Sequence, residues 1–308
     1  MKPLKLGVIG VGSVVREIYQ YLYFQSEYSP LIRVEAICDT DEDNLNTFGD
    51  VHGIPANRRF CDYEKMCREV ELEAVQVNTP DSFHAPPVIH ALEQGLDVLV
   101  PKPLCDRIED ARAMVEALKS TGRFMGVDFH KREDPRIKEA RARYRNGDYG
   151  PVQSSVWYMV DKLMVSDPNF TPRFFATDDF AARNTPVSFL TVHMADAFMF
   201  ITGLRPVEVE AVGYSQKLPS LTPVPVDGYD LVDTAILFEN GAWVHIITGW
   251  AVPNTAHAVT VQSARLIGRE GMLDLDMDRS GYSEIIADGI FERNPMFRNF
   301  ESDGTVSG

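Results

Sequence analysis

A glycine-rich turn near the N-terminus is the first stretch whose residue types and spacing could do chemistry. Residues 10–15 read GVGSVV directly after an expected strand, which supplies two of the three glycines of a dinucleotide-binding fingerprint. Such glycines let the backbone approach a pyrophosphate at a helix N-terminus. Because Val15 stands at the third position, a turn without a ligand is the alternative. The predicted cofactor contacts in this turn are Gly10, Gly12, Ser13 and Val14.

An acidic residue, Asp39, follows the second expected strand, where a dinucleotide-binding fold places a carboxylate that accepts hydrogen bonds from the ribose hydroxyls. The alternative is that Asp39 caps the next helix, but Thr40 with Asp43 can provide that cap. Asp39, Asp41 and Asp43 would repel a 2′-phosphate, and no Arg follows to bind one. We therefore predict NAD as the cofactor, with NADP less favoured.

Strands and helices that would position these residues are expected to alternate over about the first 130 residues. Short apolar runs there are separated by helix-like stretches, which predicts an α/β domain with a doubly wound parallel sheet. We expect residues 1–130 to form the NAD-binding domain. The six expected strands are Lys5–Ile9, Val34–Cys38, Arg58–Phe60, Ala74–Val77, Asp97–Val100 and Phe124–Phe129.

The pattern changes near Tyr149–Pro151, after which longer strand-like runs follow one another through turns that contain Gly or Pro. This predicts an α+β domain over residues 131–308 with an open-faced, mainly antiparallel sheet. One helix is expected from about Pro186 to Thr202, ended by Gly203. The expected strands are Val152–Val160, Val207–Tyr214, Leu231–Glu239, Ala242–Trp250, Ala258–Ile267 and Met272–Met277.

Composition excludes several classes of partner. The 308 residues include 45 Asp and Glu against 30 Lys and Arg, a formal charge of −15, so no positive field attracts nucleic acid or anionic lipid. No window approaches 18 consecutive apolar residues, and the N-terminal apolar run is too short for a signal peptide, so we expect a cytoplasmic protein. The four cysteines form no Cys-x-x-Cys pair, and we expect neither a disulfide framework nor a metal site.

Two further segments carry a resemblance to a known family. Residues 78–84 read NTPDSFH and residues 95–104 read GLDVLVPKPL. With the glycine turn, the Phe129–Arg132 segment and the His193-x-x-Asp196 pair, they make the whole chain similar to the Gfo/Idh/MocA family (glucose-fructose oxidoreductase, inositol dehydrogenase, rhizopine catabolism). The resemblance implies an NAD(P)-dependent oxidoreductase with a Rossmann domain and an open-faced antiparallel sheet domain.

The resemblance also implies roles for individual residues. Lys102 matches the lysine that lies beside the nicotinamide and hydrogen-bonds the substrate oxygen; a solvated surface lysine is the alternative. His193 matches the catalytic histidine that removes the hydroxyl proton, and Asp196 falls where substrate hydroxyls are contacted; a core histidine satisfied by Asp196 is the alternative. Thr79, Pro80 and His84 match residues of the cofactor-binding motif.

Three positions depart from the family pattern. Phe189 replaces the aspartate that family dehydrogenases of polyols commonly carry one turn before the histidine, Pro101 replaces a glutamate before the lysine, and Val15 replaces a glycine. The remaining expected substrate contacts are His130, Arg132 and Asn184. For Arg132 a surface ion pair is slightly favoured.

The predicted function is NAD-dependent hydride transfer between a sugar, inositol or related carbohydrate hydroxyl and the nicotinamide. The alternatives left open by Phe189 are an NAD-retaining glycosidase and a non-catalytic, dinucleotide-dependent regulator of a sugar pathway. The resemblance further implies a homodimer or homotetramer formed through the exposed face of the second sheet. Family chains usually continue past the final strand into another helix, so an end at Gly308 leads us to expect a truncated or atypical C-terminus.

Overall fold

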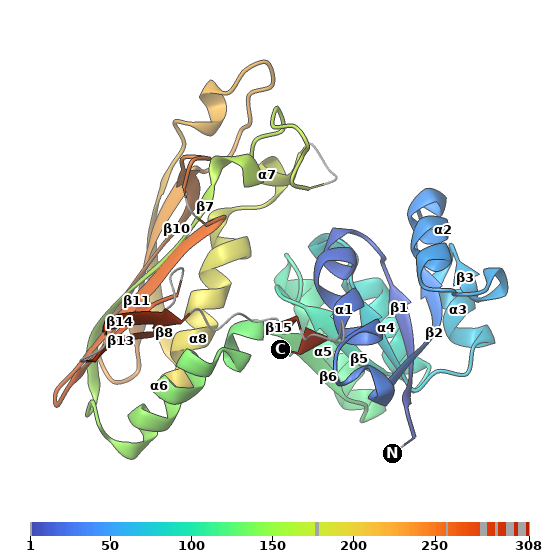
Figure 1. The fold of residues 1–308 in the computed structure, drawn as a ribbon, viewed down its shortest axis with the longest axis horizontal. Helices are drawn as coiled ribbons and strands as arrows, with labels where there is room; N and C mark the ends of the chain where they lie inside the picture. Colours follow the sequence, from blue (N-terminus) through green and yellow to red (C-terminus); the bar gives the residue numbers. More distant parts are fainter. Residues whose placement is uncertain are drawn as a thin grey trace. The chain divides into compact units, whose positions relative to one another are not determined.

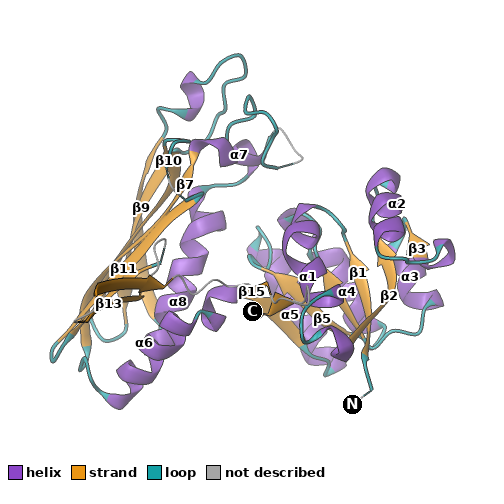
Figure 2. Cartoon of the chain, viewed as in Figure 1, coloured by secondary structure: helices purple, strands orange, loops and turns teal. Residues whose placement is uncertain are grey.

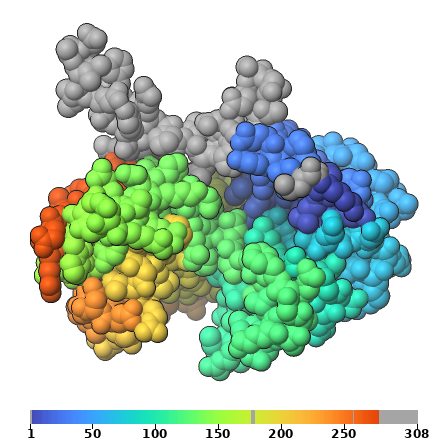
Figure 3. All heavy atoms as spheres, turned by 90° about the horizontal axis from the view of Figure 1, so that it is seen from below, coloured from blue at the N-terminus to red at the C-terminus, as the bar shows by residue number. Residues whose placement is uncertain are grey.

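The computed structural model describes residues 2–175, 179–256 and 258–277, and the strand segments 282–286, 289–293, 299–300 and 306–307. The residues whose side chains are described are coloured in Figure 3. The chain forms two compact units: the first comprises Met1–Asp128 together with Met296–Gly308, and the second comprises Phe129–Pro295. The helices and strands of both units are labelled in Figure 1. Each unit has its own apolar core.

The first unit is built on a six-stranded parallel sheet with the order β3-β2-β1-β4-β5-β6. The order reverses between β1 and β4, so the carboxyl ends of these two strands mark the point where such sheets bind ligands. The strands are β1 (Leu4–Ile9), β2 (Ile32–Cys38), β3 (Arg59–Phe60), β4 (Ala74–Val77), β5 (Asp97–Pro101) and β6 (Met125–Asp128).

Helices connect the strands of the first unit and account for their uninterrupted apolar character. Every residue of β4 is buried, as expected for a strand covered on both faces. The longer helices are α2 (Glu42–Val51), α3 (Tyr63–Glu69), α4 (Ala85–Glu93) and α5 (Ile108–Thr121). Short 3-10 turns cover Ser29–Leu31, Ala56–Arg58 and Asp81–Phe83.

The helix after β1 begins with a π-helical turn, Val15–Tyr19, and continues as α1 (Gln20–Phe24). Two tyrosines fix it to the sheet. The hydroxyl of Tyr19 donates to Asp128 Oδ2 at 2.5 Å, and that of Tyr23 donates to the side chain of Gln76 in β4. Burial raises the pKa of both tyrosines, so both remain neutral donors. These two bonds therefore anchor the middle of this helix to β6 and β4.

The second unit is built on a six-stranded sheet with the order β12-β11-β7-β10-β9-β8. All neighbouring strands are antiparallel except β7 and β10, which run parallel. The expected doubly wound parallel sheet followed by a mainly antiparallel one is thus confirmed. The strands are β7 (Val152–Lys162), β8 (Pro206–Tyr214), β9 (Leu231–Phe238), β10 (Trp243–Val252), β11 (Thr260–Gly268) and β12 (Met272–Asp276).

Helices α6 (Pro135–Asn146) and α8 (Val192–Thr202) lie on one face of this sheet (Figure 2). Large side chains such as Trp157 of β7 and Phe198 of α8 fill the space between the layers. A π-helical turn, Val187–Thr191, precedes α8, and Gly203 ends α8 in the left-handed region. The remaining elements of this unit are the 3-10 turns His130–Glu133, Leu163–Val165 and Leu218–Ser220, helix α7 (Phe180–Arg183), and the short strands β13 (Tyr282–Ile286) and β14 (Gly289–Arg293). The short strands β15 (Asn299–Phe300) and β16 (Val306–Ser307) belong to the first unit.

Candidate active site

The two glycines of the β1 turn have different structural roles. Gly10 has φ of +85° and its N–H donates to the carbonyl of Cys38 at 2.7 Å. A Cβ at Gly10 would lie 2.7 Å from the carbonyl oxygen of Asn78, so no other residue fits there. A Cβ at Gly12 would meet no atom within 4 Å. The turn therefore lies against β4 at Gly10 and leaves open space at Gly12.

The carboxylate of Asp39 faces the same turn. Its Oδ2 accepts the N–H of Val11 at 2.8 Å, and its Oδ1 accepts the N–H of Asp41 at 2.9 Å. The cap of α2 is Asp41, whose side chain accepts the N–H groups of Asp43 and Asn44. The predicted cap by Thr40 is therefore wrong, because the helix starts one residue later than expected. Asp39 is not the cap and remains available, half-buried, beside the glycine turn.

The valine at the third glycine position is explained by packing. Val15 is fully buried in the core formed by β1, β2 and the first helix. Its side chain thus points into the protein, while Ser13 is exposed at the start of the helix. The backbone N–H of Arg16 donates to the carbonyl of Gly12 at 3.1 Å and begins the helical hydrogen bonding. Because the Val15 side chain points away from the turn, it does not fill the space beside Gly12 at the start of the helix.

His84 joins the loops that follow β4 and β5. It is completely buried, with Nε2 2.8 Å from the carbonyl oxygen of Thr79 and Nδ1 3.0 Å from that of Leu104. The hydroxyl of Thr79 in turn donates to the carbonyl of Phe83 at 3.1 Å. Lys102 lies half-buried in the second of these loops, at the carboxyl end of β5. The fold therefore brings Thr79, His84 and Lys102 to one edge of the parallel sheet.

These features of the first unit fit a dinucleotide. The open space at Gly12 provides room for a pyrophosphate at a helix N-terminus, where unpaired N–H groups favour negative charge. The carboxylate of Asp39 ends the neighbouring strand and can accept further hydrogen bonds from ribose hydroxyls. Pro80, the remaining predicted contact, is exposed after β4. The cofactor roles of all these residues stay predictions.

In the second unit, two predicted histidines lie together. His193 on α8 is 4 % exposed, and the centroid of its ring lies 4.9 Å from that of His130 in a T-shaped arrangement. His130 is exposed and begins the 3-10 turn after Phe129. Two imidazole rings are thus adjacent on this unit. A histidine can act as a general base near neutral pH, and the catalytic role of His193 and the substrate contact of His130 stay predictions.

Arg132 and Asp196 form a bidentate ion pair. Arg132 donates from Nε to Asp196 Oδ2 at 2.8 Å and from its terminal Nη2 to Oδ1 at 2.5 Å. The Asp196 side chain is 6 % exposed, whereas that of Arg132 is 47 % exposed. The hydrogen bond to Asp196 raises the pKa of Arg132. The ion pair slightly favoured for Arg132 from the sequence is therefore present, and the substrate contacts expected of both residues stay predictions.

Asn184, the last predicted substrate contact, ends helix α7. Its side-chain amide donates to the carbonyl of Phe180 at 3.1 Å. This local bond is typical of an asparagine at a helix end. The bond holds the Asn184 side chain at the start of the segment leading to α8, and the substrate contact expected of Asn184 stays a prediction.

Phe189 belongs to an aromatic cluster, which we call the Phe189 cluster and define as Phe175, Phe180, Phe189 and Trp250. Its ring centroid lies 5.0 Å from that of Phe180, 5.8 Å from that of Phe175 and 6.1 Å from that of Trp250. Phe175 and Phe180 are stacked at 4.0 Å. The residue at the position of the expected aspartate is thus held by apolar packing one turn before His193.

Two charged residues were missed by the sequence analysis as candidates. Lys131 is buried, its Nζ donates to the side chain of Gln262, and burial lowers its pKa to about 8. Asp81 is half-buried after β4, and burial raises its pKa although His84 and Lys102 act in the opposite direction. Neither position carries a sequence signal, because both lie in polar stretches where exposure is the ordinary expectation.

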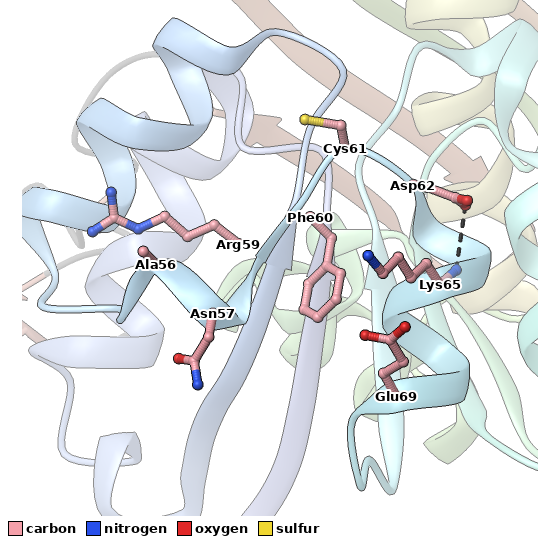
Figure 4. A pocket seen from close by; sticks show the side chains of 8 residues that line it. All are labelled: Ala56, Asn57, Arg59, Phe60, Cys61, Asp62, Lys65 and Glu69. Carbon is pink, nitrogen blue, oxygen red and sulfur yellow. Dashed lines mark hydrogen bonds between the residues drawn. The ribbon is translucent and has the colours of Figure 1, made fainter.

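A pocket of about 470 Å³ lies along the edge strand β3 of the first unit, apart from the predicted residues. Figure 4 shows side chains from β3 and α3 around it, including Arg59, Lys65 and Glu69. Among the residues that the structure describes, no group of His, Cys, Asp and Glu is arranged to hold a metal ion. No described helix is long and apolar enough to cross a membrane.

A parallel sheet of this order, with a glycine turn at the reversal and an acidic residue after β2, defines a dinucleotide-binding protein of the Rossmann type. Residues 4–129 match the family model described as "Oxidoreductase family, NAD-binding Rossmann fold" (GFO_IDH_MocA). The first unit of the chain is therefore similar to this Gfo/Idh/MocA oxidoreductase family. This match confirms the predicted family resemblance, the oxidoreductase class and NAD as the cofactor.

Curated relatives and solved structures extend the likeness beyond the first unit. The chain is 24% identical over 259 residues to D-glucoside 3-dehydrogenase of Escherichia coli, covering 81% of this chain and 71% of the relative. It is 30% identical over 174 residues to inositol 2-dehydrogenase of Rubrobacter xylanophilus, covering 51% of this chain and 48% of the relative. The structure of scyllo-inositol dehydrogenase from Lactobacillus casei with bound NAD(H) and scyllo-inositol has a TM-score of 0.77 at 19% identity, covering 95% of this chain and 82% of that one. That structural likeness shows that the fold is shared across both units.

Proposed function

We propose that this chain is an NAD-dependent dehydrogenase that acts on a hydroxyl group of a sugar, an inositol or a related carbohydrate. The observation that carries the proposal is the glycine turn at the strand-order reversal, packed against β4 at Gly10 and open at Gly12, with Asp39 beside it. Relatives that act on a glucoside and on inositol support the substrate class. None of the relatives named above is a glycosidase or a regulator.

The first unit binds and orients the cofactor. Gly12 and the start of the first helix take the pyrophosphate, and Asp39 takes the adenosine ribose. Thr79 and Pro80, in the loop after β4, would contact the cofactor, and His84 keeps this loop in place through its bond to the Thr79 carbonyl. When bound, NAD supplies the hydride acceptor for oxidation, or the donor in reduced form for the reverse reaction.

Oxidation of a secondary alcohol requires that one C–H bond break with its electron pair and that the O–H proton reach a base. Lys102 hydrogen-bonds the reacting oxygen through its ammonium and stabilises negative charge that develops there. His193 accepts the hydroxyl proton, because imidazole is a base matched to neutral pH. Asp196, fixed by Arg132, and His130 and Asn184 bind further substrate hydroxyls.

NAD-dependent turnover tests this function. Wild type and Lys102→Ala are assayed for NADH formation with inositols, sugars, amino sugars and uronic acids. We expect turnover with at least one of these classes, abolished by the substitution while NAD binding is retained. Lys119→Ala removes an exposed lysine of α5 and serves as the matched control. Absence of turnover across the panel, in a protein that binds NAD, would refute the proposal.

We also propose that two copies associate through the outer face of the second sheet, as a homodimer or within a homotetramer. The strand register places Val156, Tyr158, Ile267 and Met272 on this face, each between 37 and 58 % exposed. Light scattering of Tyr158→Lys should give a smaller species than wild type; an unchanged mass would exclude this surface. The cytoplasmic location stays a prediction.

A further inference from the structure

A basic segment of the second unit stands out in an otherwise acidic protein. The turn His130–Glu133 and helix α6 lie within residues 130–146, which contain seven Lys and Arg against three Asp and Glu, although the whole chain has a formal charge of −15. All three carboxylates have basic partners inside the segment: Glu133 pairs with Lys138, Asp134 with Arg136, and Glu139 with Arg143. The segment therefore keeps an excess of positive charge.

Arg132 is the arginine of this segment that is anchored beside the candidate base. Its partner Asp196 follows His193 by three residues on α8, which places the Cβ atoms of Asp196 and His193 about 5–6 Å apart. Arg132 also follows His130 by two residues, and the ring of His130 contacts that of His193. The Arg132 guanidinium is thus fixed about one helical turn from His193 within the same unit.

The guanidinium of Arg132 is held in one orientation and keeps one edge unused by Asp196. Its Nε and Nη2 donate to the two oxygens of Asp196, and its Cζ lies 5.5 Å from the ring centroids of both Phe129 and Phe200. The Asp196 side chain is 6 % exposed, whereas that of Arg132 is 47 % exposed. The opposite edge, formed by Nη1 and Nη2, can therefore donate to a ligand. Because a guanidinium has no acceptor, that ligand must offer acceptor oxygens.

A second guanidinium keeps the surroundings of this edge positive. Asp196 neutralises Arg132, but the Cζ of Arg141 on α6 lies 3.9 Å from the centroid of the same Phe200 ring. Arg141 is half-buried, and within the part of the chain that the structure describes its Nε has no hydrogen-bond partner. Two arginines and one aspartate around Phe200 leave a net positive charge. An anionic ligand group is therefore favoured there over a neutral one.

We propose that Arg132, supported by Arg141, binds a carboxylate of the substrate, so that the substrate is a carbohydrate acid such as a uronic or an aldonic acid. A carboxylate is planar and offers two acceptor oxygens, which matches the two donors on one edge of a guanidinium. The proposal rests on the proposed function for the reaction, whereas binding of the acid does not depend on turnover. Arg132 is thus a specificity-determining residue: the reaction occurs at a hydroxyl, and the carboxylate holds the substrate in place.

The first test measures binding without turnover. Full-length protein with NAD is titrated with three matched pairs, glucuronate and glucose, galacturonate and galactose, and gluconate and glucitol, and each Kd is determined by ligand-observed NMR. In each pair a carboxylate replaces a CH2OH group. We expect at least one acid to bind about tenfold more tightly than its neutral partner at low salt, with a smaller preference at higher ionic strength. Equal affinities within all three pairs would overturn the proposal.

Variants test whether the two arginines cause this preference. Arg141→Met removes the second charge without touching Asp196, and the double variant Arg132→Gln, Asp196→Asn removes the ion pair without leaving a buried charge. We expect both to bring the affinities for acid and neutral partner close together, and Arg132→Lys to keep part of the preference. Arg143→Gln is the matched control, because Arg143 is exposed on the same helix and pairs with Glu139 at 3.0 Å.

A purely structural role of the arginines would weaken the binding of acid and neutral compound equally, and an unchanged preference in Arg141→Met and in the double variant would overturn the proposal. If the double variant does not fold, Arg141→Met and Arg132→Lys decide. Glucose 6-phosphate is titrated as well, and tighter binding of this phosphate than of every acid would overturn the assignment to a carboxylate.

Turnover with NAD separates this proposal from the proposed function. We expect the acids to have the higher kcat/KM, mainly through a lower KM. Preferred binding of acids by a protein that oxidises none of the compounds would refute the proposed function and leave the carboxylate site standing. Oxidation of the neutral compounds without any preference for acids would overturn the carboxylate site and leave the proposed function standing.

Discussion

Substituting each glycine of the β1 turn by alanine separates folding from cofactor binding. Gly10 has positive φ and would bring a Cβ to 2.7 Å from the Asn78 carbonyl oxygen, whereas a Cβ at Gly12 has no atom within 4 Å. Gly10→Ala should therefore destabilise the first unit. Gly12→Ala should fold normally and bind NAD poorly, because its methyl group occupies the space assigned to the pyrophosphate.

The expected magnitudes follow from these contacts. A non-glycine residue in the left-handed region costs about 1–2 kcal/mol. The clash adds about 1–3 kcal/mol, since the Asn78 carbonyl belongs to the backbone that follows β4 and cannot rotate away as a side chain would. Gly10→Ala should thus lose about 2–5 kcal/mol of unfolding free energy. For Gly12→Ala we expect a change within about 0.5 kcal/mol and a loss of NAD affinity of at least tenfold, or about 1.4 kcal/mol.

Urea unfolding of the proteins without NAD, followed by calorimetric titration with NAD, measures both quantities on the same samples. Wild-type NAD affinity in a folded Gly12→Ala protein would show that the pyrophosphate does not occupy this turn. Wild-type stability in Gly10→Ala would contradict the assigned contact with Asn78. The pair is informative because the two substitutions are chemically identical and only two residues apart.

Three further predictions concern the second unit. Phe189→Asp should lower the unfolding free energy by about 3 kcal/mol or more in urea titrations, because a carboxylate replaces a ring packed in the Phe189 cluster; a change below about 1 kcal/mol would contradict that packing. Arg132→Ala should destabilise more than Asp196→Asn, because it leaves a buried carboxylate unpaired; equal losses would refute the asymmetry. Burial lowers the pKa of Lys131 to about 8, so above this pH Lys131 binds fewer protons in the folded state than in the unfolded state, and the unfolding free energy should rise from about pH 8 towards pH 10. Lys131→Met should flatten this rise in urea titrations over the same pH range. The same dependence on pH in wild type and variant would exclude Lys131 as its source.

The elements of the fold could be predicted because apolar runs and turn residues are local signals. Ala74–Val77 was expected with the observed bounds, and the predicted ends of most other strands differ from the observed ones by one or two residues. Gly203 ends α8 as expected. The widening of Val187–Thr191 into a π-helical turn was not predictable, because it depends on packing against distant strands and not on residue period.

The cap of α2 shows the limit of such local signals. Thr40 and Asp41 can both accept the N–H groups of a first turn, so composition alone does not decide which one starts the helix. The error is one residue, but it changes which carboxylate is available. Asp41 is occupied by the helix, and Asp39 stays beside the glycine turn.

In the candidate site, too, the residues that a short motif identifies could be predicted, whereas contacts between distant positions could not. The glycine turn, His84 and Lys102 are found from motifs because each acts through its own loop. In the second unit, the side-chain contacts of Arg132 and Lys131 join positions far apart in the chain: Arg132 reaches Asp196 across 64 positions, and Lys131 reaches Gln262 across 131. A motif can therefore indicate which residue reacts, whereas side-chain partners that come from distant positions, such as Asp196 for Arg132, are found only once the elements are placed.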